Sequence, residues 1–425
     1  MQATIKKIVY PGKSLCVSGG KVIFTDEGLP NELVKLDIRS QKSNYTRAQT
    51  CQVLKASPWR AHTRCDHYKV CSPYQYINYP FQLHIKQEQL AEIFLRTLKI
   101  KNENIEIKAS PRIWGYRNKV HLHVRWQKKT ASLAYHLPEI NDRFIHITCC
   151  FLISEEMNRL AQAILAIISR HEESAIQEIG IKESSSKKEL LLVLYADSSR
   201  LTQKFLDSVI ELPKTFSIEG IIGITGGNKA RKENLIWGKS YIEEKIEGYM
   251  FRIGAQSFFQ VNTAMLTTMC NDIAQSTHFN AGETIADLYC GVGTFGILLA
   301  KKVCRVIGIE ASRENTLLLE QNLKINHIEN FTVYNEYSET WFRKRVKEPA
   351  DTLIIDPPRK GIGKEICEHL LKYSCQRIIY ISCDPATLLR DLKILLAGYS
   401  LERITGYDFF PHTPHIETCT LLVKK

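Results

Sequence analysis

The stretch TIADLYCGVGTFG, residues 284–296, decides the fold. It begins as a short apolar strand, reaches Asp287, and passes through a glycine-rich turn into the segment TFGILLAKKV, which is typical of a helix. Helical segments such as SRENTLLLEQNLKI and TLLRDLKILLAG separate four further strand-like runs: RVIGIE, DTLIID, RIIYIS and CTLLVKK. This alternation predicts an α/β domain with a doubly wound, mostly parallel sheet of the Rossmann-like type.

Polar or reactive residues stand at the ends of these strands. Three carboxylates and one thiol stand at the ends of strands: Asp287, Glu310, Asp356 and Cys383. Glu417 comes just before the last strand. Ligands bind at the carboxyl ends of parallel strands, so we expect one crevice to collect these side chains. The glycines of the turn suit a dinucleotide as well. However, Asp287, the DPPR sequence and the lack of recognisable hydride-acceptor residues favour S-adenosylmethionine over NAD.

Cys383 and Glu417 together indicate a particular methyl acceptor. C5 of uracil is a poor nucleophile, and it becomes enolate-like when a thiolate adds to the neighbouring C6. After methyl transfer, a base must remove the C5 proton so that the thiolate can leave. We therefore predict that Cys383 is the nucleophile and Glu417 the general base. The ordinary alternative is a buried structural cysteine.

The chain before residue 256 reads as two smaller domains. Residues 1–56 alternate short strand-like runs with Pro-Gly, Gly-Gly and Gly-Leu-Pro breaks, which predicts a small antiparallel β-barrel. Residues 57–255 mix strands with a helix opened by Ser154 as its cap, which predicts an α+β domain. Residues 256–425 form the Rossmann-like domain. This three-part division suits a chain of 425 residues.

Charge favours a polyanionic partner. The formal net charge is +12, and between Leu95 and Thr130 ten Lys and Arg residues face only Glu103 and Glu106. Three aromatic residues stand among these cations: Trp114, Tyr116 and Trp126. The cations can bind phosphates, and the aromatic rings can stack on unpaired bases. A solvated basic surface is the alternative. We expect a cytoplasmic protein, because no membrane span or secretion signal is recognisable and the thirteen cysteines form no evident disulfide framework.

Several motifs resemble the RNA (uracil-C5)-methyltransferases, S-adenosylmethionine-dependent enzymes that modify 23S rRNA and tRNA. The segment from Tyr10 to Ile38 resembles the TRAM barrel of this family, and SPRIWGYRNKVHLHV resembles its central domain. The catalytic motifs are matched by AQSFFQVN, DLYCGVGTFG, IIDPPRKG, ISCDPATLLRDL and FFPHTPHIE. The resemblance places the nucleophile at Cys383, the base at Glu417, and the cofactor contacts at Gln260, Tyr289, Thr294, Glu310 and Asp356. Thr294 stands where the family often has Asn.

The resemblance also implies the fold arrangement and the partner. It predicts a monomer that binds RNA and no membrane, with 23S rRNA as the substrate, because the tRNA-specific branch commonly lacks the barrel. The tRNA reaction is the nearest alternative, and a non-catalytic RNA-binding protein is an alternative of another class. In family members, the helix that corresponds to residues 87–99 can pack with the catalytic domain.

Many family members also bind a [4Fe-4S] cluster through Cys-x5-Cys-x2-Cys and a distant fourth cysteine. This chain keeps Cys65 and Cys71 but has Tyr74 at the third position, and Cys150 is in better register than Cys149 for the fourth. Cluster ligation normally needs four thiolates. We therefore favour residual thiols over a degenerate cluster site at Cys65, Cys71 and Cys150.

Overall fold

The chain divides into two compact units in the computed structural model, which describes residues 1–100, 105–137, 143–196, 200–226, 231–345, 349–373 and 375–425. The barrel unit comprises Met1–Ile113, Ser382–Lys393 and Ile404–Cys419. The sheet unit comprises Trp114–Ile381, Ile394–Arg403 and Thr420–Lys425. The division therefore falls within three of the C-terminal strands, Arg377–Ser382, Tyr399–Tyr407 and Glu417–Lys424.

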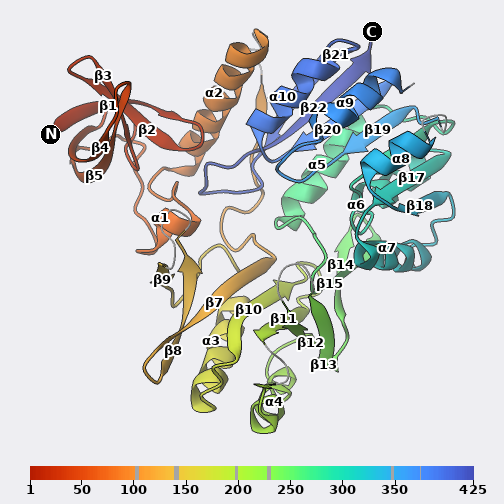
Figure 1. Cartoon of the computed structure of the whole chain (residues 1–425), viewed down its shortest axis with the longest axis horizontal. Helices are drawn as coiled ribbons and strands as arrows, with labels where there is room; N and C mark the ends of the chain where they lie inside the picture. The colour runs from red at the N-terminus through yellow and green to blue at the C-terminus, as the bar shows by residue number, and fades with distance from the viewer. Residues whose placement is uncertain (101–104, 138–142, 197–199, 227–230, 346–348, 374) are drawn as a thin grey trace. The chain divides into compact units, whose positions relative to one another are not determined.

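The barrel unit begins with a closed barrel of five strands (Figure 1). The sequence predicts a small antiparallel barrel, but the pairing is not antiparallel throughout, because the strands Lys21–Thr25 and Tyr45–Lys55 pair in parallel. Its strands, in the barrel order β1-β2-β3-β5-β4, are β1 (Gln2–Val9), β2 (Lys13–Ser18), β3 (Lys21–Thr25), β4 (Leu33–Gln41) and β5 (Tyr45–Lys55). Alternate side chains of β1, including Ala3 and Ile5, pack inside with Cys16, Ile23 and Val34. This alternation is what a closed barrel requires.

A long helix, α2 (Tyr79–Leu98), follows the barrel and the short helix α1 (Tyr68–Cys71). Its cap is Asn78, whose side chain accepts a hydrogen bond from the Phe81 backbone N at 3.1 Å. The helix therefore begins eight residues before the predicted segment 87–99. A further strand of this unit, β6 (Glu106–Lys108), pairs in parallel with β21 (Tyr399–Tyr407).

The sheet unit contains a seven-stranded sheet with the order β13-β12-β11-β10-β7-β8-β9. Helix α3 (Glu155–Arg170) packs against this sheet, and the Ser154 side chain accepts from the Met157 N as predicted. The strands are β7 (Lys119–Gln127), β8 (Thr130–His136), β9 (Phe144–His146), β10 (Ile176–Glu183), β11 (Leu190–Ala196), β12 (Ile218–Thr225) and β13 (Lys232–Gly238). Helix α4 (Gln203–Val209) and the hairpin of β14 (Tyr241–Ile246) and β15 (Tyr249–Gly254) complete this part.

The C-terminal sheet has the strand order β18-β17-β16-β19-β20-β22-β21-β6. Its first five strands are parallel neighbours: β16 (Thr284–Leu288), β17 (Arg305–Glu310), β18 (Phe331–Asn335), β19 (Thr352–Ile355) and β20 (Arg377–Ser382). The last strands are β21 (Tyr399–Tyr407) and β22 (Glu417–Lys424). This arrangement confirms the predicted Rossmann-like α/β class.

Helices alternate with these strands, as the sequence pattern predicts. They are α5 (Thr263–Ser276), α6 (Thr294–Leu299), α7 (Arg313–Ile325), α8 (Ser338–Arg345), α9 (Gly363–Lys372) and α10 (Pro385–Leu395). The central strands are fully buried, with Leu353, Ile354 and Ile355 of β19 at 0% exposure. Within the described ranges, no helix is both long enough and apolar enough to cross a bilayer.

Candidate active site

The glycine-rich turn after β16 brings the backbone into a tight loop. Tyr289, Gly291 and Gly293 have φ angles of 62°, 56° and 88°. A Cβ atom at Gly293 would lie 2.2 Å from Leu319 Cδ1, so this position admits only glycine. Thr294 then opens α6. At Gly291, an added Cβ would meet nothing closer than 4.0 Å, so there is open space beside this backbone.

Asp287 lies at the floor of this turn and is 1% exposed. Its Oδ2 accepts from the Gly296 N at 2.9 Å, while its Oδ1 is buried with no hydrogen-bond partner in the described part of the chain. Burial raises the pKa of Asp287 to about 8, the Gly296 hydrogen bond opposes the shift, and the nearby carboxyl groups of Asp356 and Glu310 add to it. Three carboxyl groups therefore gather where β16, β17 and β19 end.

Glu310, at the end of β17, is held by backbone donors. Its Oε2 accepts from the Gly291 N at 3.0 Å, and its Oε1 accepts from the Ser312 N at 2.7 Å. These bonds fix the carboxylate against the glycine turn. Cys290, in the same turn, is buried; that burial raises its thiol pKa, and its backbone N donates to the Ile309 O at 3.2 Å. Its thiol packs against β17, because a Cβ atom at Gly308 would lie 3.2 Å from the Cys290 Sγ.

Asp356, directly after β19, pairs with Gln260. The Gln260 Nε2 donates to Asp356 Oδ2 at 3.2 Å. Burial raises the pKa of Asp356 to about 7, and the Gln260 hydrogen bond opposes that shift. The structure therefore brings together two predicted cofactor residues that lie 96 positions apart.

The loop that carries Gln260 is braced from the seven-stranded sheet. Asn118 Nδ2 donates to the Gln260 O at 2.8 Å. Lys182 Nζ donates to the Gly254 O at 2.6 Å and the Ser257 O at 2.8 Å, and burial lowers its pKa to about 7. Sequence reasoning missed both supports. Asn118 lies within the quoted SPRIWGYRNKVHLHV motif, which is the signal that points to it.

Lys119, which follows Asn118 and begins β7, is not a solvated cation. Its Nζ donates to the Phe259 O at 3.4 Å and lies 4.9 Å from the ring centre of Phe258. Burial, with Arg117 nearby, lowers the pKa of Lys119 to about 8. The basic stretch is thus partly structural, and its residues Lys101 and Glu103 lie outside the described residues.

Cys383 lies in the turn between β20 and α10. It is partly exposed. The next residue, Asp384, caps the helix: its Oδ1 accepts from the Ala386 N at 2.8 Å and from the Thr387 N at 3.3 Å. The Ser382 Oγ donates to the Asp384 O at 3.1 Å. The thiol is therefore presented by a fixed turn at a helix N-terminus.

Glu417 is the first residue of β22 and is 2% exposed. It belongs to the same unit as Cys383. Helix α2 holds the loop before it, because Lys86 Nζ donates to Asp408 Oδ1 at 2.5 Å and to the Phe410 O at 3.2 Å. Both side chains of the Lys86–Asp408 pair are fully buried. Burial is the main cause that lowers the pKa of Lys86, and Asp408 opposes it.

His412, in the same loop, is fixed by Gln82 of α2. The His412 backbone N donates to Gln82 Oε1 at 2.8 Å, and the Gln82 Nε2 donates to the ring Nδ1 at 3.0 Å. Burial, with Lys86 and Arg64, lowers the pKa of His412 to about 3, so the ring is neutral at physiological pH. His412 therefore helps to fix the loop that leads to Glu417.

Cys65 and Cys71 share one hydrogen-bond network, because the Gln75 Nε2 that contacts Cys65 also donates to the Ser72 Oγ at 2.7 Å, next to Cys71. Cys65 Sγ accepts from the Gln75 Nε2 at 3.4 Å, and Cys71 Sγ lies 3.3 Å from the Ser72 Oγ. Tyr74, at the third position, is 1% exposed and packs in a cluster with Ile8 and Ile85, while Cys150 is part of the core under the seven-stranded sheet. Across the described residues, no group of three or more His, Cys, Asp or Glu side chains is arranged to hold a metal ion.

Comparison with known proteins identifies a family. Residues 78–425 match the family described as tRNA (Uracil-5-)-methyltransferase. An RNA methyltransferase of Aquifex aeolicus is 30% identical over 100% of this chain and 99% of its own length. One from Clostridium tetani is 28% identical over 100% of this chain and 97% of its own length. Both relatives are named as uncharacterized RNA methyltransferases.

A solved structure shares the fold over the whole length. It is the Pyrococcus abyssi tRNA (uracil-54, C5)-methyltransferase in complex with S-adenosyl-L-homocysteine, with a TM-score of 0.77, 24% identity and 100% coverage of both chains. At this identity the likeness shows the fold. The sequence match over residues 78–425 shows more: this chain belongs to the RNA uracil-5-methyltransferase family.

Proposed function

We propose that this protein transfers a methyl group from S-adenosylmethionine to C5 of uracil in RNA, with 23S rRNA as the substrate. The observation that carries the cofactor assignment is the gathering of three carboxyl groups around the glycine turn: Asp287, Glu310 and Asp356. S-adenosylmethionine carries a sulfonium charge and ribose hydroxyls. Carboxyl groups offer it both a compensating charge and hydrogen-bond acceptors.

The residues that would hold this cofactor fit its chemistry. Glu310, fixed against the turn, would accept from the ribose hydroxyls, and the open space beside Gly291 lets the ligand approach the backbone. We assign the remaining contacts to Gln260, Tyr289, Thr294 and Asp356. The name of the Pyrococcus abyssi structure, which contains S-adenosyl-L-homocysteine, supports the same cofactor.

Cys383 and Glu417 carry the proposed chemistry at the base. When bound, S-adenosylmethionine supplies an electrophilic methyl group. The Cys383 Sγ forms a bond to C6 of uracil, and the displaced electron pair makes C5 nucleophilic. The adduct with Cys383 would make C5 able to accept that methyl group, with the neutral thioether S-adenosylhomocysteine as the leaving group. Glu417 accepts the C5 proton, the C5–H electron pair restores the C5–C6 double bond, and the Cys383 thiolate is released.

The surroundings of both residues support these roles. Cys383 stands at the N-terminal end of α10, whose dipole favours a thiolate over a thiol. Glu417 is 2% exposed, so bulk water has little access to the proton it accepts. Lys86 and Gln82 brace the preceding loop and thereby fix the position from which β22 begins.

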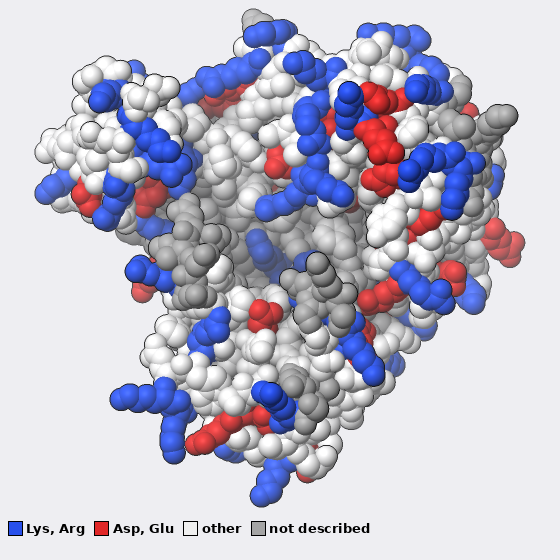
Figure 2. Space-filling model, viewed as in Figure 1, with Lys and Arg blue, Asp and Glu red and all other residues white. Residues whose placement is uncertain are grey.

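The remaining domains would hold the RNA. We assign residues 1–56 and 57–255 to RNA binding and residues 256–425 to methyl transfer. Figure 2 shows basic side chains spread over the visible face, on the barrel as well as elsewhere, which accords with the net charge of +12. The tRNA reaction is a second candidate, because the fold likeness to a protein named for tRNA covers the whole chain, barrel included.

The test is methylation of defined RNAs. The purified protein is incubated with methyl-labelled S-adenosylmethionine and with 23S rRNA or tRNA transcripts, and the RNA is digested to nucleosides for mass spectrometry. We expect 5-methyluridine in 23S rRNA with the wild type and none with Cys383→Ala. Label in tRNA alone would select the second candidate. RNA binding without methylation of either RNA would favour a non-catalytic RNA-binding protein.

A further inference from the structure

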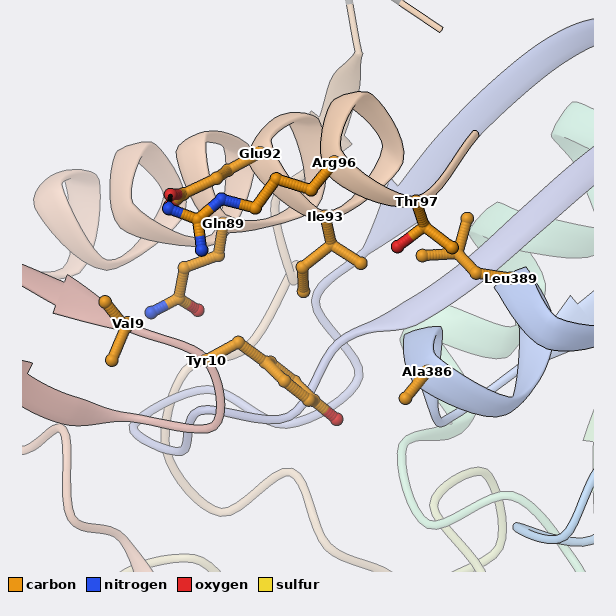
Figure 3. A pocket seen from close by; sticks show the side chains of 9 residues that line it. All are labelled: Val9, Tyr10, Gln89, Glu92, Ile93, Arg96, Thr97, Ala386 and Leu389. Carbon is orange, nitrogen blue, oxygen red and sulfur yellow. Dashed lines mark ion pairs between the residues drawn. The ribbon is translucent and has the colours of Figure 1, made fainter. Parts of the chain in front are cut away.

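A cavity of about 290 Å³ lies between the end of β1, helix α2 and helix α10 (Figure 3). Tyr10, Gln89, Ile93, Ala386 and Leu389 line it, and all belong to the barrel unit, which also contains Cys383 and Glu417. This volume is just below the range of sites for whole small ligands, about 300–1,000 Å³, so it suits a smaller group such as one nucleobase.

We propose that this cavity binds one unpaired nucleobase of the substrate RNA, from a nucleotide close to the target uridine. The proposal rests on the proposed function, and it adds a base-binding subsite to it. Figure 3 shows the Tyr10 ring on one side of the cavity and the Ile93 side chain on the other. An aromatic ring opposite an aliphatic side chain forms a slot in which a flat base is stacked.

The inner end of the slot offers a fixed hydrogen-bond acceptor. Gln89 is 4% exposed, and its Nε2 donates to the Ile8 O at 3.2 Å and to the Tyr74 OH at 3.3 Å. These two bonds fix the orientation of the amide. The Gln89 Oε1 accepts no hydrogen bond from the described residues, and it suits an N–H group on the edge of a base.

Cations beside the slot suit a phosphate: Arg96 lines the cavity with Glu92, and Lys7, outside the lining, contacts Glu92. Lys7 Nζ and the Arg96 guanidinium both contact the Glu92 carboxylate, Lys7 at 2.7 Å, so two cations share one anion and leave an excess positive charge. The side chains of Lys7 and Arg96 are 41% and 72% exposed. Exposed ion pairs are weak, so these cations can turn toward a backbone phosphate.

The slot is also close to the proposed nucleophile along the chain. Ala386 comes three residues after Cys383, so their Cα atoms are separated by at most about 11 Å. Neighbouring nucleotides of a single strand can span this distance. A base held in the slot would thus fix the register of the strand whose uridine reaches Cys383.

The test compares variants that empty or fill the slot with matched controls. Tyr10→Ala removes the stacking ring, and Tyr10→Phe keeps it. Ile93→Trp fills the slot, whereas Leu95→Trp adds the same bulk on the same helix at a position that is 45% exposed and outside the lining. Two quantities are measured for each variant: the Kd for fluorescein-labelled hexauridylate, and kcat/KM for the RNA that the wild type methylates. Binding of S-adenosylmethionine is also measured for each variant, as a control that the variant is folded.

We expect Tyr10→Ala and Ile93→Trp to weaken hexauridylate binding and to lower kcat/KM by roughly five- to a hundred-fold, the range for one lost base stack. Tyr10→Phe and Leu95→Trp should stay close to the wild type. Equal binding and equal kcat/KM in all five proteins would overturn the slot and leave the proposed function intact. Weaker binding in the two slot variants, with no methylation by any protein, would uphold the slot and reject the proposed function.

Discussion

Burial of carboxyl groups at the strand ends sets the electrostatics of the candidate cofactor site. Asp287 and Asp356 have pKa values raised to about 8 and about 7, chiefly because their charged forms are removed from water. Near neutral pH, a large share of these groups is protonated in the cofactor-free protein. A bound cation would reverse this balance, because it favours the charged carboxylates.

Asp287→Asn should stabilise the cofactor-free protein at pH 8. The folded protein holds a proton on Asp287 up to about pH 8, while the unfolded chain loses it near pH 4. The contribution of Asp287 to the free energy of unfolding is therefore complete below about pH 4 and is lost as the pH rises to 8. Asparagine keeps an acceptor for the Gly296 N and removes the ionisation. We expect a gain in unfolding free energy on the order of 2 kcal/mol at pH 8, and less at pH 5. Urea unfolding measures the free energy at both pH values. A lower unfolding free energy of Asp287→Asn at both pH 8 and pH 5 would contradict the raised pKa of Asp287.

S-adenosylmethionine binding should tighten with pH relative to S-adenosylhomocysteine. Between pH 6 and pH 9, Asp356 and Asp287 lose their protons, and the added negative charge favours the sulfonium cation. S-adenosylhomocysteine has the same amino acid and ribose but a neutral thioether, so it is the matched control. Calorimetry should show that the Kd of S-adenosylhomocysteine, divided by the Kd of S-adenosylmethionine, rises from pH 6 to pH 9. An unchanged ratio would show that these carboxyl groups do not face the sulfonium.

Residues at the strand ends were predictable from sequence, and their supports were not. Glu310 and Asp356 follow from the strand pattern, since parallel strands place their carboxyl ends at one edge. Asn118, Lys182 and Gln82 act on partners 142, 72 and 330 positions away in the sequence. The motif around Asn118 draws attention to that residue, but a local pattern in one sequence does not identify partners at such distances.

Helix α2 acts as a brace for the loop that leads to Glu417. Its buried residues include Gln82 and Lys86, which are polar. These residues also explain why only the second half of the helix was predicted: buried polar side chains interrupt the hydrophobic periodicity from Tyr79 to Lys86. The ends of α3, by contrast, follow from an uninterrupted apolar face and the Ser154 cap.

Breaking the buried pair on α2 should be costly. Lys86→Met leaves Asp408 buried without its cation, which we expect to lower the unfolding free energy by about 3–5 kcal/mol. The double variant Lys86→Met/Asp408→Leu removes both charges and should regain most of that loss. Chemical denaturation of the three proteins tests this. If the double variant is no more stable than Lys86→Met, the pair is not the source of the loss.

At the scale of the whole molecule, the proposed catalytic residues and the candidate cofactor site belong to different units. The barrel unit contains Cys383 and Glu417, and the sheet unit contains the carboxyl groups of the cofactor site. The sequence predicts three consecutive domains, with boundaries at residues 56 and 255, and these boundaries remain predictions. The discontinuous units arise because α2 binds the loop after β21, an association between segments more than 300 residues apart.

Net charge predicts a strongly salt-dependent RNA affinity. With a formal charge of +12, phosphate contacts release counterions on binding. We expect the affinity for a 23S rRNA transcript to fall more than roughly tenfold between 50 and 200 mM salt. Filter binding at several salt concentrations gives the slope. An affinity independent of salt would mean that base contacts, and not phosphates, dominate binding.

The most direct test of the account is whether Cys383 becomes covalently attached to RNA. The protein is mixed with S-adenosylmethionine and 5-fluorouridine-substituted 23S rRNA or tRNA and run on a denaturing gel. Fluorine at C5 cannot leave as a proton, so the wild type should give a shifted band that Cys383→Ala lacks. Glu417→Gln should accumulate the same band even with ordinary uridine, because the C5 proton stays in place. A band that persists in Cys383→Ala, or no band with either RNA despite methylation, would contradict the assignment of Cys383 as the nucleophile.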